Sequence, residues 1–260
     1  MPGDLRRGID AALASVPGAD LKRASAALSE RYRGEVRDGR FHIAGDLDAR
    51  AYLATRMPAT YAAIRRSLAE LAEVLPQWTA ASLIDAGAGT GAALWAAADC
   101  WPALARADLV EASPAMRALG QGLAQEAFGA RASWHGNDAT RGLADLSPAD
   151  LVTAAYVLGE LAAPQRDRLV DRLWTLTTGT LVIVEPGTPA GWQRILTARA
   201  RLIAAGASIA APCPHAFACP LTPPDWCHFA GYPTLGRFTL QAFRPSRHAG
   251  PPCRPRLAAG

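Results

Sequence analysis

The sequence predicts an α/β protein built on a doubly wound parallel sheet, and three observations lead to that prediction. The chain has 260 residues, of which 50% are hydrophobic, so it can bury the core of one large domain with smaller additions. From residue 81 to about residue 206, short apolar runs alternate with helical stretches. The stretch Leu83–Gly91 reads as a buried strand that runs directly into a glycine-rich turn. Such alternation is typical of a parallel sheet with helices on both faces.

The expected strands and helices take turns along this domain. Strands are expected at Ser82–Asp85, Ala107–Glu111, Arg131–His135, Leu151–Ala155 and Thr180–Glu185. Helices are expected at Thr90–Ala98, 114–127, Pro164–Thr175 and 191–206. Each strand is four to six residues of mostly apolar sequence, the length and composition of a buried strand.

Four regions are expected in total. Residues 1–80 form an N-terminal helical region, 81–206 the sheet domain, 207–235 a cysteine-rich metal-binding loop, and 236–260 a disordered or aberrant tail.

The helical region is expected to contain helices over residues 5–33 and 46–75. Apolar residues recur in the second at steps of three and four, the spacing of one buried stripe. The Met57-Pro58 pair predicts a break there, because proline cannot continue a helix from the preceding turn.

Composition narrows the class of protein. No apolar run approaches the roughly 20 residues of a membrane span, and the first residues lack the apolar core of a signal peptide. A cytoplasmic location is therefore expected, where five cysteines are better explained as metal ligands or buried thiols than as disulfides. The net charge is +4, and residues 181–260 form the basic end. Arginines there, such as Arg194, Arg199 and Arg201, are expected to hold RNA phosphates, and nothing indicates DNA.

The glycine turn is the first candidate site. Asp85 closes the first strand, and Gly87, Gly89, Thr90 and Gly91 follow. Glycines let the backbone bend sharply and approach a ligand, while the amides that begin the next helix favour a carboxylate or phosphate. Alone the motif is weak, because its spacing departs slightly from the dinucleotide fingerprint.

Acidic residues at the ends of the next two strands strengthen the case. Glu111 ends the second strand, where a carboxylate can accept hydrogen bonds from two ribose hydroxyls, and Asn137 and Asp138 follow the third, where a side chain can meet an adenine edge. Together with the turn they resemble S-adenosylmethionine-dependent methyltransferases of the Rossmann-like class. In the alternative interpretation Glu111 caps the next helix and Asp138 sits in a turn. NAD binding is the second candidate for this domain.

The end of the fourth strand does not identify the chemistry. Residues 154–161 contain neither the Asn/Asp-Pro-Pro-aromatic pattern of exocyclic amino methylation nor a Pro-Cys nucleophile. Tyr156 and Glu160 would lie near the cofactor's sulfonium, and Glu160 is a weak candidate for a general base. A role at a helix start or in the core is the simpler interpretation of Glu160.

A second candidate site lies in the proline-broken stretch 213–229. Cys213, Cys219 and Cys227 are spaced Cys-x5-Cys-x7-Cys, wider than the usual opening pair of a zinc knuckle. His215 or His228 would complete a zinc site, whereas Cys253 would give four thiolates, which suits zinc or an iron–sulfur cluster. Three buried, unligated thiols are the remaining alternative.

These residues, with several longer stretches, resemble the methyltransferase-like assembly factors of the small ribosomal subunit, a family found in mitochondria and bacteria. The matching stretches are Ala51–Ile64, Asp85–Trp95, Tyr156–Leu161, Val184–Gly191, Ala211–His215, Cys219–Pro220 and Asp225–Phe229. The resemblance covers roughly residues 20–230. Beyond Ala230 the sequence looks like unrelated arginine- and proline-rich sequence, as a truncated or frameshifted end would.

The resemblance implies a Rossmann-like methyltransferase domain that binds S-adenosylmethionine, and a 4Fe-4S cluster on four cysteines. It carries Cys213, Cys219 and Cys227 over as cluster ligands, with Cys253 as the candidate fourth, and the glycine turn, Glu111 and Asp138 as cofactor positions. It also implies binding to the maturing small subunit through ribosomal RNA.

Three functions stay open at this point. The leading one is a methyltransferase or assembly factor of the small subunit. The others are a catalytically silent RNA-binding scaffold, and a small-molecule methyltransferase with a structural zinc loop.

Overall fold

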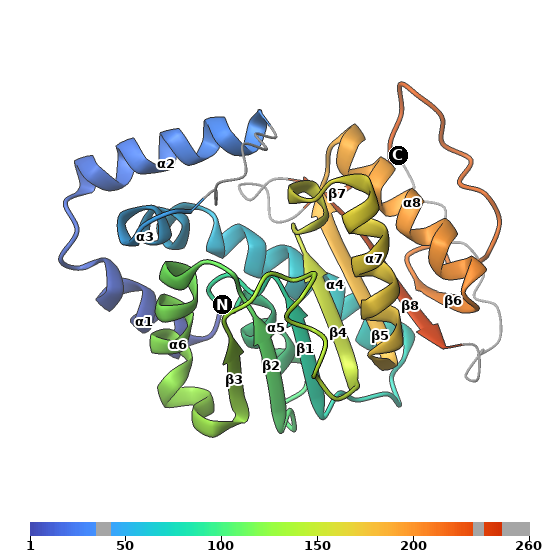
Figure 1. Cartoon of the computed structure of the whole chain (residues 1–260), viewed down its shortest axis with the longest axis horizontal. Helices are drawn as coiled ribbons and strands as arrows, with labels where there is room; N and C mark the ends of the chain where they lie inside the picture. The colour runs from blue at the N-terminus through green and yellow to red at the C-terminus, as the bar shows by residue number, and fades with distance from the viewer. Residues whose placement is uncertain (35–42, 231–236, 246–260) are drawn as a thin grey trace.

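A mixed sheet forms the centre of the molecule (Figure 1). The computed structural model describes residues 1–34, 43–230 and 237–245, and within them eight strands form one sheet. The strand order is β3-β2-β1-β4-β5-β8-β6, and β7 pairs with β8. The strands are β1 Ser82–Ala86, β2 Arg106–Val110, β3 Ala132–His135, β4 Ala149–Ala155, β5 Thr177–Pro186, β6 Ala207–Ala211, β7 Phe229–Ala230 and β8 Arg237–Pro245.

Strands β1 to β5 are parallel as expected, while β8 runs antiparallel between β5 and β6, so the expectation of a wholly parallel sheet is wrong at this edge. The carboxyl ends of the parallel strands therefore meet at one edge of the sheet. The glycine turn follows β1 there, Glu111 follows β2, and Tyr156 follows β4. The strand order reverses beside β1, and ligands bind at such a point in open α/β sheets.

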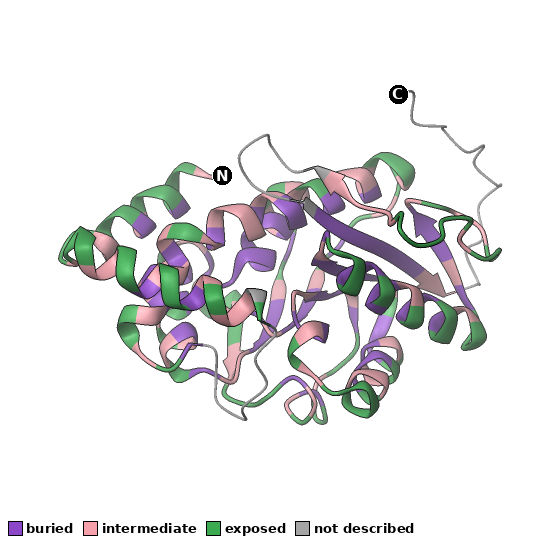
Figure 2. Ribbon diagram, turned by 90° about the horizontal axis from the view of Figure 1, so that it is seen from above, coloured by how far each residue is buried: buried purple, intermediate pink, exposed green. Residues whose placement is uncertain are grey.

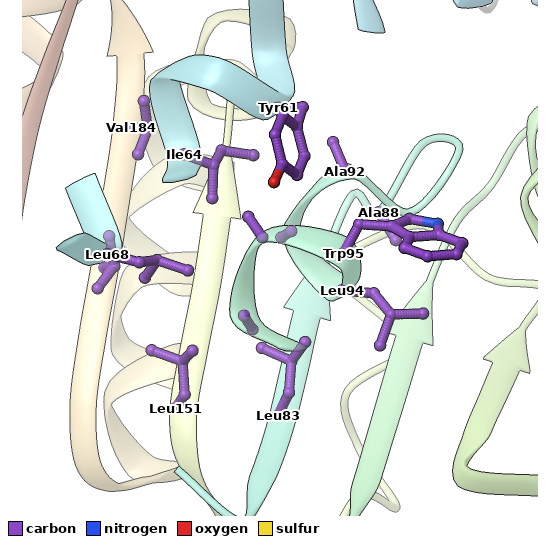
Figure 3. Close-up of a cluster of buried hydrophobic side chains, with 14 of the residues drawn as sticks. Tyr61, Ile64, Leu68, Leu83, Ala88, Ala92, Leu94, Trp95, Leu151 and Val184 are labelled. Carbon is purple, nitrogen blue, oxygen red and sulfur yellow. The ribbon is translucent and has the colours of Figure 1, made fainter. Parts of the chain in front are cut away.

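Helices cover both faces of the sheet, as the alternation predicts. On one face α4, α5 and α6 pack over the strands, and in Figure 3 Ile64 and Leu68 of α4 lie among Leu83, Leu151 and Val184. On the other face α7 and α8 cover a second set of buried side chains. Buried residues accordingly line the sheet and the inner faces of the helices (Figure 2). The helices are α4 Met57–Val74, α5 Ala92–Cys100, α6 Pro114–Phe128, α7 Ala163–Thr175 and α8 Pro189–Ala204.

Three further helices precede α4, namely α1 Gly3–Leu13, α2 Gly18–Arg33 and α3 Asp46–Thr55. The single helix expected over residues 5–33 is wrong in one respect, because the chain leaves the helix after Leu13 and α2 begins only after Pro17. The predicted break at Met57-Pro58 is confirmed, since α3 ends at Thr55 and α4 begins at Met57. Among the described helices, none combines the length and the apolar character that crossing a bilayer would require.

Strand β8 corrects the expectation of a disordered tail from residue 236 and of unrelated sequence from residue 231. Residues 237–245 pair with β5 and β6 and lie inside the sheet. Phe238 is buried on the face covered by α4, and Phe243 is buried on the face covered by α7 and α8. The segment is a strand because its side chains alternate between two buried faces. Residues 231–236 and 246–260, including Cys253, lie outside the described residues.

Candidate functional site

The turn after β1 brings backbone amides to the carboxyl edge of the sheet. Gly87 and Gly89 have φ angles of 75° and 58°, a region where a residue with a Cβ is strained. A Cβ on Gly87 would also lie 2.3 Å from Cγ2 of Val157, so the turn packs closely against the segment after β4. The turn leads into α5, whose first amides favour an anionic group.

Glu111 lies directly beside this turn. Its Oε2 accepts a hydrogen bond from the Gly89 amide at 2.7 Å, and its Oε1 accepts one from the Ser113 amide at 2.7 Å. Burial raises the pKa of Glu111, and these amide donors oppose the rise. Because a carboxylate has about four acceptor positions, both oxygens can still accept from a ligand. Glu111 therefore belongs to the glycine turn in space as well as by its place after β2.

Asp85, just before the glycines, and Thr90, between Gly89 and Gly91, are buried polar residues of this turn. Asp85 is 2% exposed and accepts a hydrogen bond from the Thr153 hydroxyl at 2.7 Å. Burial, more than any neighbouring charge, raises its pKa to about 7. The Thr90 hydroxyl is buried and, within the described part of the chain, has no hydrogen-bond partner. A polar group without a partner at this position suits a site that a polar ligand completes.

Asn137 and Asp138 follow β3, and both are exposed. One Asp138 oxygen accepts hydrogen bonds from the amides of Thr140 and Arg141 at 2.9 and 3.1 Å. This is the turn geometry named as the alternative for Asp138, and the other oxygen lies 3.8 Å from the Arg141 guanidinium. An adenine contact by either residue stays a prediction.

Tyr52 is a candidate site residue that the sequence analysis missed. It lies on α3, and its hydroxyl is 3.9 Å from the point where a Cβ on Gly89 would stand. The hydroxyl also lies 3.4 Å from Oγ1 of Thr60 on α4. Burial raises the pKa of Tyr52 to about 12, so the phenol stays protonated at neutral pH. Its three- and four-residue spacing to other apolar residues makes it look like part of the buried stripe of the helix.

Tyr156 and Glu160 lie on the segment that follows β4. Tyr156 has a φ of 62°, in the left-handed region, and such backbone costs about 1–3 kcal/mol and is common at functional sites. Glu160 ends the short 3-10 helix Leu158–Glu160 and is exposed. Desolvation first, and then the carboxylates of Glu111 and Glu185, raise its pKa to about 7. The structure thus places Glu160 on the same side of the sheet as Glu111.

The three cysteines expected to converge do line one pocket. Cys213, Cys219 and Cys227 border a cavity of about 40 Å³ between α8, β8 and the loop after β6. His215 also lines this cavity, whereas the His228 ring lies 3.3 Å from the Trp226 carbonyl oxygen. Burial raises the pKa of the Cys227 thiol to about 11, and the neighbouring cysteines add to the rise.

The cysteine pocket does not have the geometry of a single-ion site. Within residues 1–34, 43–230 and 237–245, no three His, Cys, Asp or Glu side chains are grouped so that they could hold one metal ion. Thiolates on one tetrahedral zinc would stand about 3.8 Å apart, given zinc–sulfur bonds of about 2.3 Å. The cysteine-rich metal loop therefore stays a prediction, and the thiols share a cavity without forming a mononuclear site.

Comparison with known proteins places the chain in a family. Residues 46–242 match the model of the family described as mitochondrial small ribosomal subunit Rsm22. The chain belongs to the Rsm22 family. The human ribosome assembly protein METTL17, mitochondrial, is 31% identical to this Rsm22-family chain in an alignment of 194 residues, and the match covers 69% of this chain and 42% of the human protein. The chain therefore spans less than half of that relative's length. The family match reaches into β8, well past Ala230.

Solved structures with the same fold are methyltransferases. Magnesium protoporphyrin IX methyltransferase from Synechocystis, solved with bound S-adenosylmethionine, superposes with a TM-score of 0.53 at 15% identity, over 89% of this Rsm22-family chain and 100% of that one. An O-methyltransferase family protein from Burkholderia thailandensis gives a TM-score of 0.55 at 15% identity, over 87% and 70% of the two chains. The Rossmann-like methyltransferase fold expected from the sequence is confirmed.

The arginines of α8 in this Rsm22-family member do not form the RNA-facing row that their sequence suggests. Arg194 and Arg199 are 7% and 5% exposed, and Arg194 pairs with the buried Glu185 at 2.6 Å. Arg201 points outward but pairs with Asp171 and Asp167 on α7. The expectation that Arg194 and Arg199 hold RNA phosphates is wrong, because both side chains are buried inside the fold.

Proposed function

We propose that this chain binds S-adenosylmethionine at the carboxyl edge of the sheet and acts in maturation of the small ribosomal subunit. The observation that carries the cofactor assignment is Glu111, whose two oxygens accept hydrogen bonds from the Gly89 amide of the glycine turn and from the Ser113 amide before α6. A carboxylate fixed in this way presents its remaining acceptor positions to a pair of ribose hydroxyls. The proposed cofactor residues are Asp85, Gly87, Gly89, Thr90, Gly91, Glu111, Asn137 and Asp138, with Tyr52 added from α3.

The methyl acceptor would enter on the side of Tyr156 and Glu160. When bound, the cofactor supplies an electrophilic methyl group, and the protein orients the acceptor and removes its proton. Glu160 suits the second task, because a pKa of about 7 lets it accept a proton at neutral pH. The Tyr156 phenol, whose pKa burial raises, stays neutral and borders the same region.

An iron–sulfur cluster is the second part of the proposal. Its ligands would be Cys213, Cys219 and Cys227, with Cys253 as the candidate fourth and His228 as the alternative. In a 4Fe-4S cluster each iron would be held by one thiolate, so these cysteines would surround the cluster instead of meeting at one ion. The three thiols that line one cavity support this part of the proposal.

The ribosomal role rests on the family relationship. Membership of the Rsm22 family, and 31% identity to a mitochondrial ribosome assembly protein, support the small subunit as the partner, and we propose its RNA as the contact. One observation favours the silent scaffold as second candidate. Residues 154–161 carry no motif of amino or ring-carbon methylation. A catalytically silent scaffold would still have the glycine turn and Glu111, because these belong to the methyltransferase fold.

Two measurements test this proposal. Anaerobic purification should yield a brown protein containing iron and sulfide, and a colourless protein with one zinc would instead support the structural zinc loop. Labelled S-adenosylmethionine is then incubated with small subunits from a strain lacking the protein. Label transfer to RNA that Glu160→Gln reduces would support the enzyme. Subunit binding without transfer would support the scaffold, and absence of binding to subunits would contradict the ribosomal role.

A further inference from the structure

Arg199 is a buried cation that faces the cysteine pocket. It lies on α8, is 5% exposed, and lines the same cavity as Cys213, Cys219 and Cys227. Desolvation lowers its pKa, and the nearby thiols of Cys213 and Cys219 oppose that shift. A guanidinium stays charged in proteins in spite of such a shift, so the pocket contains a permanent positive charge.

All the hydrogen-bond acceptors of Arg199 are neutral. Nη1 donates to Oε1 of Gln241 on β8 at 3.2 Å. Nη2 donates to the carbonyl oxygen of His215 and, at 3.2 Å, to that of Phe217, and it lies 3.4 Å from Nδ1 of His215. Within the described ranges, no carboxylate lies within ion-pair distance of Arg199. The guanidinium is therefore well oriented but lacks an opposite charge.

The other two arginines of α8 pair with carboxylates. Arg194 is as deeply buried and has Glu185 as its counter-charge, while Arg201 pairs with acidic residues of α7. A buried charge is costly unless it is paired. At Arg199 the groups that could supply negative charge are the thiols that share its pocket. The arrangement points to a centre that is anionic when formed.

We propose that Arg199 is the fixed counter-charge of a thiolate-bound iron–sulfur cluster in this pocket, and that it positions the loop carrying Cys213 and Cys219. This inference rests on the proposed function, because it takes the cluster as the occupant. A cluster held by thiolates carries net negative charge and gains one more on reduction, and net charge and surrounding groups set its potential. A neighbouring guanidinium therefore favours the reduced state. Its hydrogen bonds to the carbonyl groups of His215 and Phe217 hold the loop in the shape that brings the cysteines to the cavity.

The test compares the anaerobically purified full chain with Arg199→Gln, Arg199→Lys and Arg201→Gln. Iron and sulfide per chain, the rate of cluster loss to a chelator, and the midpoint reduction potential are measured for each, with circular dichroism as a check on folding. Removing a partner next to a metal site commonly costs about 10–100-fold in affinity, so Arg199→Gln should lose its cluster much faster. It should also have a lower midpoint potential than the wild type. Arg199→Lys keeps the charge and should keep the potential, while Arg201→Gln should match the wild type in all three measurements.

The outcomes separate the two levels of the proposal. A wild type with iron and sulfide whose potential and cluster retention are unchanged in Arg199→Gln would overturn the role of Arg199 and leave the cluster standing. Faster loss at an unchanged potential would reduce Arg199 to a loop support and would overturn the counter-charge. If Arg199→Gln does not fold, Arg199→Lys provides the test, because it keeps the positive charge. A midpoint potential of Arg199→Lys lowered as much as loss of the charge would lower it would contradict the inference. A wild type without iron or sulfide would overturn both the cluster and this inference.

Discussion

Truncating Phe243 tests whether β8 is part of the native core. Phe243 is fully buried and faces Leu181 of β5 and Ile209 of β6 across the sheet. Phe243→Ala removes the ring from the layer beneath α7 and α8 and leaves a cavity, which typically costs about 3–5 kcal/mol. A domain of this kind has a free energy of unfolding of about 5–15 kcal/mol, so the variant should lose a large fraction of its stability.

Phe217→Ala is the matched control, because this phenylalanine is 79% exposed in the cysteine-rich loop. Exposed substitutions usually change stability by about 0.5 kcal/mol or less. Urea unfolding followed by far-UV circular dichroism gives both free energies of unfolding. If Phe243→Ala were as stable as Phe217→Ala, the ring would not be in the core, and the pairing of β8 with β5 and β6 would be refuted.

Three further predictions concern polar groups. Tyr52→Phe should weaken S-adenosylmethionine binding by up to about tenfold, since a hydrogen bond contributes about 0.5–1.5 kcal/mol. Tyr61→Phe is the control, because the Tyr61 hydroxyl donates to Asp99, and it should bind like the wild type. Equal affinities of the two variants in calorimetry would place Tyr52 outside the site. Because burial raises the pKa of Asp85 to about 7 from its usual value near 3.9, its contribution to the free energy of unfolding is largest at low pH and is lost as pH rises through that interval. Asp85→Asn should flatten this dependence in urea titrations, and an unchanged slope would contradict the shift. Arg194→Met should destabilise the fold by about 3–5 kcal/mol, because it leaves the buried Glu185 carboxylate without its counter-charge. Adding Glu185→Leu should restore much of that loss in the same urea assay. An Arg194→Met variant as stable as the wild type would contradict the buried ion pair.

The parallel part of the sheet was predictable because each of its elements is encoded locally. The apolar run Leu83–Asp85 ends in glycines whose positive φ angles the structure requires, and Glu111 follows the next strand at the same edge. Five expected strands and four expected helices occur within a few residues of their predicted bounds. Local patterns were sufficient to locate these elements, because each strand is a short apolar run bounded by turn or helix signals.

The features that the sequence did not reveal depend on tertiary contacts. Strand β8 alternates Phe238, Leu240 and Ala242 with Thr239 and Gln241, a strand pattern that was passed over among the surrounding arginines, prolines and glycines. Only its pairing with β5 and β6 shows that the face with Thr239 and Gln241 is buried as well. Tyr52 has the spacing of a core residue, and only the packing of α3 against the glycine turn gives its hydroxyl a place in the site. Arg199 looks like a surface cation, because its burial is decided by a loop and a strand distant in sequence.

Calorimetric titration with S-adenosylmethionine tests the cofactor site most directly. The titration compares the wild type with Glu111→Gln and with Glu126→Gln, whose carboxylate is exposed on α6. The wild type and Glu126→Gln should bind with equal affinity. Glu111→Gln should bind about tenfold to a hundredfold more weakly, since a hydrogen bond to a charged group contributes about 1.5–3 kcal/mol. A wild type that does not bind, or equal affinity in all three proteins, would contradict the assignment.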